Sequence, residues 1–161
     1  LYNVILPIWL LWLFPQLFIF VAPANLAVDC VVLAVTLTAL RHRGKGAVLK
    51  KLWWKFWLLG FLADFMGVLV LLPGAFLPAL FSDAAWTYDI STAMIATPFR
   101  HPASLLWTLV GVALAGVCIY FFDKRAMKKC DLLTAGEKHV VALTMAIVTA
   151  PWLFLVPMYL Y

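Results

Sequence analysis

Long apolar runs, separated by short basic segments, dominate the chain. Between Lys55 and Asp83 there are 27 residues, and Asp64 carries the only charge among them. A hydrocarbon core about 30 Å thick is crossed by roughly 20 apolar residues of α-helix. The run therefore predicts a transmembrane helix over residues 52–72. Two further stretches without a charged residue predict spans over 103–122 and 140–160.

The first 40 residues form a longer apolar run that carries a single charge, Asp29. One helix of that length would be about 60 Å long, twice the thickness of the hydrocarbon core, so we expect the run to fold back. Pro23 is the expected turn, because proline lacks the backbone N–H of a helical residue. Residues 25–40 then span. Residues 4–21 either span as well, for five helices in all, or form a re-entrant or interfacial segment, for four; their length favours a span.

The distribution of basic residues predicts which loops face the cytoplasm. Residues 41–55 contain six Lys and Arg and no acidic residue, and residues 123–138 contain five basic and three acidic residues. Loops rich in Lys and Arg are retained on the cytoplasmic side. We therefore expect both segments in the cytoplasm and the loop 73–103, with a net charge of −1, outside. The expected location is the cell membrane, with the chain as a multi-pass protein.

The outer loop contains an amphipathic stretch. Ser82 and Asp83 are residue types that cap helix N-termini. They predict a short helix through Trp86, Tyr88 and Met94 that lies along the outer leaflet.

The composition excludes a soluble globular protein. Hydrophobic residues make up 66% of the chain and charged residues 12%, about half of the share in a soluble domain. The predicted fold class is all-α, a polytopic transmembrane bundle of four or five helices, in one integral membrane domain over residues 1–161. The expected partners are the lipid bilayer and either other membrane protein subunits or further copies of the chain. Nucleic acid is not an expected partner, because the positive charge lies at the membrane ends rather than on one face of a domain.

Two acidic residues fall inside predicted spans. Asp29 lies 12 residues before Arg41 and Asp64 lies 9 residues after Lys55, so both are roughly 14–18 Å from the cytoplasmic end. A charge near the centre of a membrane costs a few kcal/mol, so both side chains are expected to face the interior of the bundle, at similar depth. Asn25 shares the helix face of Asp29. The functional interpretation is a shared proton or a bound cation; the simpler one is a pair of hydrogen-bonded acids that holds two helices together.

Thr149 belongs to the same predicted polar layer. Pro151, two residues later, leaves the carbonyl of Ile147 without its helical donor. That carbonyl lies at about the depth of the carboxylates, where it is either a cation ligand or part of a kink satisfied by Thr149.

Small residues predict close helix packing at two places. Gly60 and Gly67 flank Asp64 on one face of its helix, and Gly111 and Ala115 share a face of the next span. Residues without bulky side chains let two helix backbones approach closely in a membrane.

The chain has no motif that predicts catalysis or a bound cofactor. The cysteines and histidines are not spaced as metal ligands, so no metal and no cofactor is expected, and the three cysteines are expected to be free thiols. The sequence therefore predicts a non-enzymatic protein. The function we expect is that of a structural or accessory subunit of a larger membrane assembly. The alternative is a small proton or cation pathway, a channel or transporter, built around Asp29 and Asp64.

Overall fold

The computed structural model describes residues 15–81 and 84–156, and this part of the chain is helical, with no strand. Four helical segments of the described residues are long and apolar enough to cross a membrane. They comprise α2 (Pro15–Ala39), α3 (Lys45–Ala75), α6 (Pro102–Ala126) with η2 (Met127–Lys129), and α7 (Ala135–Val148) with η3 (Trp152–Leu155). Between α3 and α6 lie α4 (Leu77–Leu80), α5 (Ala85–Ala96) and η1 (Pro98–Arg100). The predicted all-α transmembrane bundle is confirmed.

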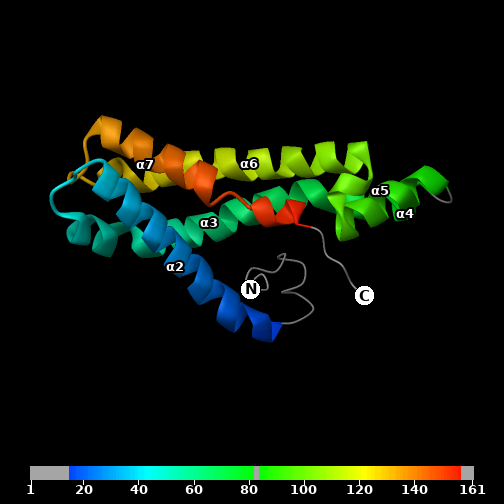
Figure 1. Cartoon of the computed structure of the whole chain (residues 1–161), viewed down its shortest axis with the longest axis horizontal. Helices are drawn as coiled ribbons and strands as arrows, with labels where there is room; N and C mark the ends of the chain where they lie inside the picture. The colour runs from blue at the N-terminus through cyan, green and yellow to red at the C-terminus, as the bar shows by residue number, and fades with distance from the viewer. Residues whose placement is uncertain (1–14, 82–83, 157–161) are drawn as a thin grey trace.

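The bundle is built around the antiparallel pair of α3 and α6, which lie side by side along their length (Figure 1). α7 packs on α6, and α2 packs on α3 and α7 at one end of the molecule, before its N-terminal half diverges from the other helices (Figure 1). Apolar side chains such as Val31, Leu106 and Val117 point outward as well as inward, so the outer surface suits contact with lipid.

The main apolar core lies at the end where α2 turns into α3 and α6 turns into α7. Leu37, Val48 and Phe56 are fully buried there, together with Met127 and Val141 from the other two helices. Two polar contacts join the turns: His42 Nδ1 lies 2.8 Å from Glu137 Oε1, and Lys51 Nζ donates to the Lys129 carbonyl at 3.3 Å.

Both basic segments of the sequence therefore lie at this end, which we call the basic end. We call the opposite end, formed by α4, α5 and η1, the far end.

The turn between α2 and α3 is much shorter than the predicted loop 41–55. α3 already begins at Lys45, directly after Gly44, whose φ of 102° suits glycine. Lysine and leucine are good helix formers, and Val48 and Leu52 bury themselves in the core from this first part of α3. The basic residues thus lie mainly on a helix rather than in a loop.

The predicted turn at Pro23 is wrong. α2 continues from Pro15 through Pro23 to Ala39, so part of the predicted span 4–21 and most of the span 25–40 belong to one helix. Inside a membrane no water can satisfy the backbone groups of a turn, and a helix that continues past proline leaves fewer of them unpaired. The beginning of the segment 4–21, as far as residue 14, lies outside the described residues.

The last span is interrupted rather than merely kinked. α7 ends at Val148, and a 3₁₀-helix, η3, resumes at Trp152 after the sequence Thr149-Ala150-Pro151. Of the predicted span 140–160, residues 157–160 lie outside the described residues.

The helix predicted in the outer loop is present as α5. Trp86 and Tyr88 are exposed on it, whereas Met94 is buried against the rest of the molecule. Its N-cap is Ala84. The predicted caps, Ser82 and Asp83, lie outside the described residues.

Candidate functional site

The Asp29 side chain reaches from α2 to the surface of α3. One of its carboxylate oxygens lies 3.7 Å from the position that a β-carbon on Gly60 would occupy. Asp64 follows Gly60 by one turn of α3, and the negative charge of Asp29 acts on it. The two acids thus share the interface of α2 and α3.

A third acid, Asp123, enters the same interior from α6. Its residue is 2% exposed, and the charge of Asp29 acts on its carboxylate as well. The expectation that Asp123 lies in the loop 123–138 is therefore wrong, because α6 continues to Ala126 and turns this side chain inward. The sequence carried a signal for it: Asp123 follows Ala115 and Ile119 at steps of four residues, on the buried face of α6.

We call Asp29, Asp64 and Asp123 the carboxylate column, since they lie at successive depths. Gly67 of α3 meets Gly111 and Ala115 of α6, which gives a common level for counting along the antiparallel pair. Counted along α3 from Gly67 toward the basic end, Asp64 is three residues away and Gly60 is seven residues away. Counted along α6 from Ala115 in the same direction, Asp123 is eight residues away. At 1.5 Å per residue these steps are about 5, 10 and 12 Å, with Asp29 at the level of Gly60.

Among the described residues, two oxygens of the column have neither a counter-charge nor a hydrogen-bond donor. Asp64 Oδ1 and Asp123 Oδ2 are buried and have no hydrogen-bond partner among the described residues. The ion pair found among the described residues joins His42 and Glu137, and neither residue belongs to the column. Moving an ionised carboxylate out of water costs several kcal/mol unless it is paired. The column is therefore suited to holding protons or a cation.

A tight helix contact closes the column on its far side. A β-carbon on Gly67 would lie 3.1 Å from the Gly111 carbonyl oxygen, 3.1 Å from the Ala115 β-carbon and 3.3 Å from the Phe154 ring. The absence of side chains at Gly67 and Gly111 allows this approach of the two backbones. Gly60 differs from Gly67, because it faces Asp29 of α2 rather than α6.

The other members of the predicted polar layer have different surroundings. Asn25 lies one turn before Asp29 on α2 and is half-buried. The Thr149 hydroxyl donates to the Met145 carbonyl at 2.8 Å.

The carbonyl of Ile147, freed by Pro151, accepts a hydrogen bond from Trp152 Nε1 at 2.7 Å. Both sequence interpretations of this carbonyl are therefore wrong: it is neither an open cation ligand nor satisfied by Thr149. An indole one residue after the proline can fold back onto the preceding turn, which the sequence alone did not reveal.

The described residues hold no group of three His, Cys, Asp or Glu side chains arranged to bind a metal ion. The three cysteines, Cys30, Cys118 and Cys130, are free thiols. The members of the column thus follow one another in depth and do not converge on one point.

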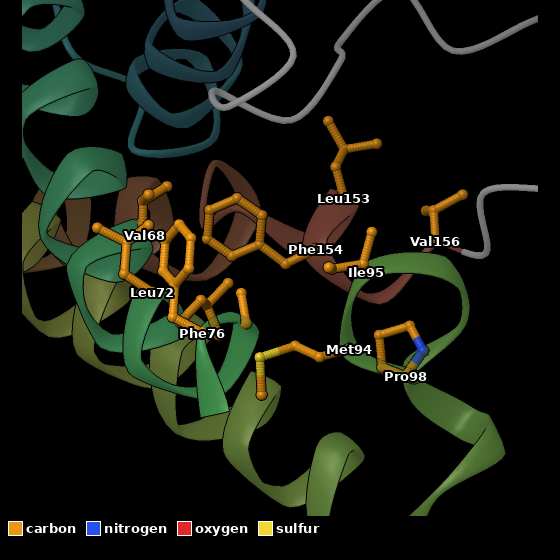
Figure 2. Close-up of a pocket in the computed structure, with 11 residues that line it drawn as sticks. Val68, Leu72, Phe76, Met94, Ile95, Pro98, Leu153, Phe154 and Val156 are labelled. Carbon is orange, nitrogen blue, oxygen red and sulfur yellow. The ribbon is translucent and has the colours of Figure 1, made fainter. Parts of the chain in front are cut away.

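A separate apolar cavity of about 250 Å³ lies at the far end, between α3, α5 and η3. Figure 2 shows Phe154 of η3 pointing toward Val68 and Leu72 of α3, with Met94 on the opposite wall. None of the described residues that line the cavity is titratable, and it is smaller than most small-molecule sites, which measure roughly 300–1,000 Å³. It offers no group for the chemistry of the column.

Fold and site together define a multi-pass helical membrane protein with a column of three acids, of which Asp123 is buried and Asp29 and Asp64 are half-buried. Comparisons with protein-family models, curated proteins and solved structures find no match for the chain.

Proposed function

We propose that this protein is a proton or cation pathway that uses the carboxylate column. The observation that supports the proposal is the pair of buried oxygens, Asp64 Oδ1 and Asp123 Oδ2, that have no partner among the described residues. Ionisable residues inside a membrane that lack a structural partner commonly belong to proton relays or ion paths. We assign the protein no enzymatic activity, no cofactor and no nucleic-acid partner.

The simpler interpretation, in which the acids hold the helices together, accounts less well for this geometry. Acids that act as helix glue donate or accept hydrogen bonds across the interface. Here the unpaired oxygens belong to two different helices, α3 and α6. Three acids without a counter-charge among the described residues are the kind of groups that gain and lose protons, and so change charge, during function.

Ion flux across a reconstituted membrane tests the proposal. The purified chain is placed in liposomes with a trapped pH dye, and a potassium diffusion potential drives proton entry; a parallel set uses a sodium dye and a sodium gradient. Wild type should give a flux above empty liposomes in one of the two sets. Asp64→Asn should abolish that flux while the protein stays folded, because an amide cannot exchange protons or carry the negative charge that attracts a cation.

The matched control is Asp89→Asn, which changes an exposed acid on α5 at the far end. It should leave the flux unchanged. Flux equal to that of empty liposomes in both sets, or wild-type flux in Asp64→Asn, would overturn the proposal.

A second candidate is a structural or accessory subunit of a larger membrane assembly. The observation that favours it is the contact of Gly67 with Gly111, which ends the column on its far side within a single chain. A continuous path would then need a partner subunit or another copy. Purification in a mild detergent, followed by native mass spectrometry, tests this role: a stable complex with another membrane protein supports it, and a lone monomer that is active in liposomes contradicts it.

A further inference from the structure

We infer that a groove between α6 and α7 binds one anionic phospholipid from the leaflet at the basic end. One acyl chain lies in the groove, and the phosphate lies at Lys124, Tyr120 and His139. This site is separate from the carboxylate column, so the inference does not depend on ion flux.

The groove follows α6 and α7, which lie side by side (Figure 1). Its volume is about 580 Å³, within the roughly 300–1,000 Å³ of small-molecule sites. A β-carbon on Gly116 would lie 3.3 Å from the Ala146 carbonyl oxygen, so the two backbones meet closely at the floor. The exposed apolar side chains along the groove include Ala113, Val117, Phe121, Leu143 and Ile147. These side chains suit contact with an acyl chain.

The length of the groove matches one leaflet of a membrane. On α6 the lining runs from Leu109 to Phe121, and these twelve steps are about 18 Å of helix. Half of a hydrocarbon core about 30 Å thick is about 15 Å. An acyl chain that enters at the basic end can therefore follow the groove as far as the centre of the membrane.

Polar side chains gather at the end of the groove nearest to the basic end, which we call the mouth. Tyr120 and His139 line it, and the tyrosine hydroxyl lies 2.9 Å from the imidazole Nδ1. Lys124 Nζ donates to the same hydroxyl at 3.0 Å. A lysine has two further N–H donors, and an imidazole has a second nitrogen. The mouth thus offers donors to phosphate oxygens, which accept charge-assisted hydrogen bonds.

The charge around the mouth favours an anionic head group. Residues 123–138 contain five basic and three acidic residues. Of these acids, Asp123 is buried and Glu137 belongs to the ion pair, so Asp131 is the exposed one. None of the described residues that line the groove is acidic. Basic pockets between helices on the cytoplasmic side of a membrane bind anionic head groups in this way.

Native mass spectrometry of the purified chain in detergent tests the head group. Phosphatidylglycerol and phosphatidylcholine with identical acyl chains are titrated separately. Wild type should bind one phosphatidylglycerol about fivefold more tightly than phosphatidylcholine, because a cation near the head group favours the anionic lipid. Lys124→Gln should remove this preference, and Lys124→Arg should keep it. The matched control is Lys128→Gln, an exposed lysine outside the groove, which should also keep it.

A second pair of variants tests the place of the acyl chain. Ala113→Phe puts a ring into the groove and should weaken phosphatidylglycerol binding about tenfold, because the added atoms take the space of the chain. Val110→Phe, at an exposed position of the same helix outside the groove, should bind as wild type. In wild type, a phosphatidylglycerol with a diazirine on its acyl chain should label α6 and α7 along the groove.

Equal affinity of wild type for the two lipids overturns the inference, because the groove then holds any lipid of the bilayer. Unchanged phosphatidylglycerol binding in Lys124→Gln or in Ala113→Phe overturns it as well. So does a copurified protein that covers the groove and excludes lipid. If Ala113→Phe does not fold, the diazirine decides: label spread evenly over the outer faces of α2 and α3 as well as α6 and α7 contradicts the inference.

Discussion

The missing β-carbon at Gly60 gives the Asp29 carboxylate room against α3. At the next glycine of the same helix the situation differs, because a β-carbon on Gly67 would press against the backbone of α6 as well as against the side chains of Ala115 and Phe154. The distances are 3.7 Å to the Asp29 oxygen at Gly60 and 3.1 Å to the Gly111 carbonyl oxygen at Gly67. The two glycines, seven residues apart, thus have different roles. Gly60 leaves room for the Asp29 side chain, and Gly67 allows α6 to pack closely on α3.

This difference predicts opposite effects of the same substitution. Gly60→Ala should leave stability unchanged or raise it by up to about 1 kcal/mol, since alanine favours the helix and meets an ordinary contact distance. Gly67→Ala should lower stability by about 1–3 kcal/mol, because α3 and α6 must move apart. Reversible unfolding of the two variants in mixed micelles measures both. Equal stability of Gly67→Ala and Gly60→Ala would show that α3 and α6 are not in close contact at this level.

At the scale of the helices, tryptophan side chains bond main-chain carbonyls near prolines, and at Pro151 the bonded carbonyl is the one that the proline frees. Three described prolines lie inside the spanning segments, and near each an indole N–H donates to a main-chain carbonyl. The bonds run from Trp57 to Ala22 at 2.9 Å, from Trp107 to Val70 at 2.8 Å and from Trp152 to Ile147 at 2.7 Å. The prolines concerned are Pro23, Pro73 and Pro151.

The first two bonds also join neighbouring helices, α3 to α2 and α6 to α3. They do not satisfy the carbonyls that Pro23 and Pro73 deprive of a helical donor, which are those of Ile19 and Leu69, so their contribution is to helix packing.

The Trp152 bond predicts a non-additive pair of substitutions. Trp152→Phe should lower stability by about 1–3 kcal/mol, because it leaves the Ile147 carbonyl without a donor. Pro151→Ala returns a backbone N–H to this carbonyl, so the double variant Pro151→Ala/Trp152→Phe should be more stable than Trp152→Phe alone. Trp86→Phe, at an exposed position of α5, is the control for loss of an indole. Additive effects in the thermodynamic cycle would show that the indole and the proline do not act on the same carbonyl.

At the scale of the whole molecule, the two turns at one end predict the orientation in the membrane. The His42–Glu137 and Lys51–Lys129 contacts hold both basic segments at the same end, and loops rich in Lys and Arg are retained in the cytoplasm. In a background without native cysteines, Gly46→Cys and Asp131→Cys should react with an impermeant thiol reagent only from the cytoplasm. Ala84→Cys should react only from outside. Labelling of Ala84→Cys from the cytoplasm would reverse the orientation.

The sequence predicted the positions of the spans better than their ends. Long apolar runs located the candidate spans of α3, α6 and α7, because the length of such a run is set by the thickness of the bilayer. The ends of α2 and α3 were misjudged, at Pro23 and Lys45. Proline ends most helices in water, but within an apolar layer α2 continues past it. The lysines from Lys45 onward were assigned to a loop because of their charge, but they lie in the first turns of α3.

Among the site residues, the presence of two acids inside spans was predictable, but their relative depth and their neighbours were not. Asp29 and Asp64 stood out because each is the only charge in a long apolar run. Asp123 lies next to Lys124 and Arg125, so in the sequence it could not be told from an exposed charged residue at the end of a helix. The donor to the Ile147 carbonyl was likewise hidden, because Trp152 reaches it only through the fold of the chain after Val148.

The sequence by itself determined the class of the protein, the approximate place of the spans over α3, α6 and α7 and where along the chain the cations gather, and it left open whether there are four or five spans. Each of these follows from one segment and its surroundings: an apolar run against a hydrocarbon layer, or a basic segment against a membrane surface. The tertiary structure alone decided which faces meet, and so that three acids form one column, that Gly67 closes it and that indoles donate to carbonyls near prolines. The physical reason is that helices in this chain are apolar on nearly all sides, toward lipid as well as toward one another. A helix of this kind has no polar stripe to mark its buried face, so its partners are selected by the shapes and hydrogen bonds of helices far apart in the sequence.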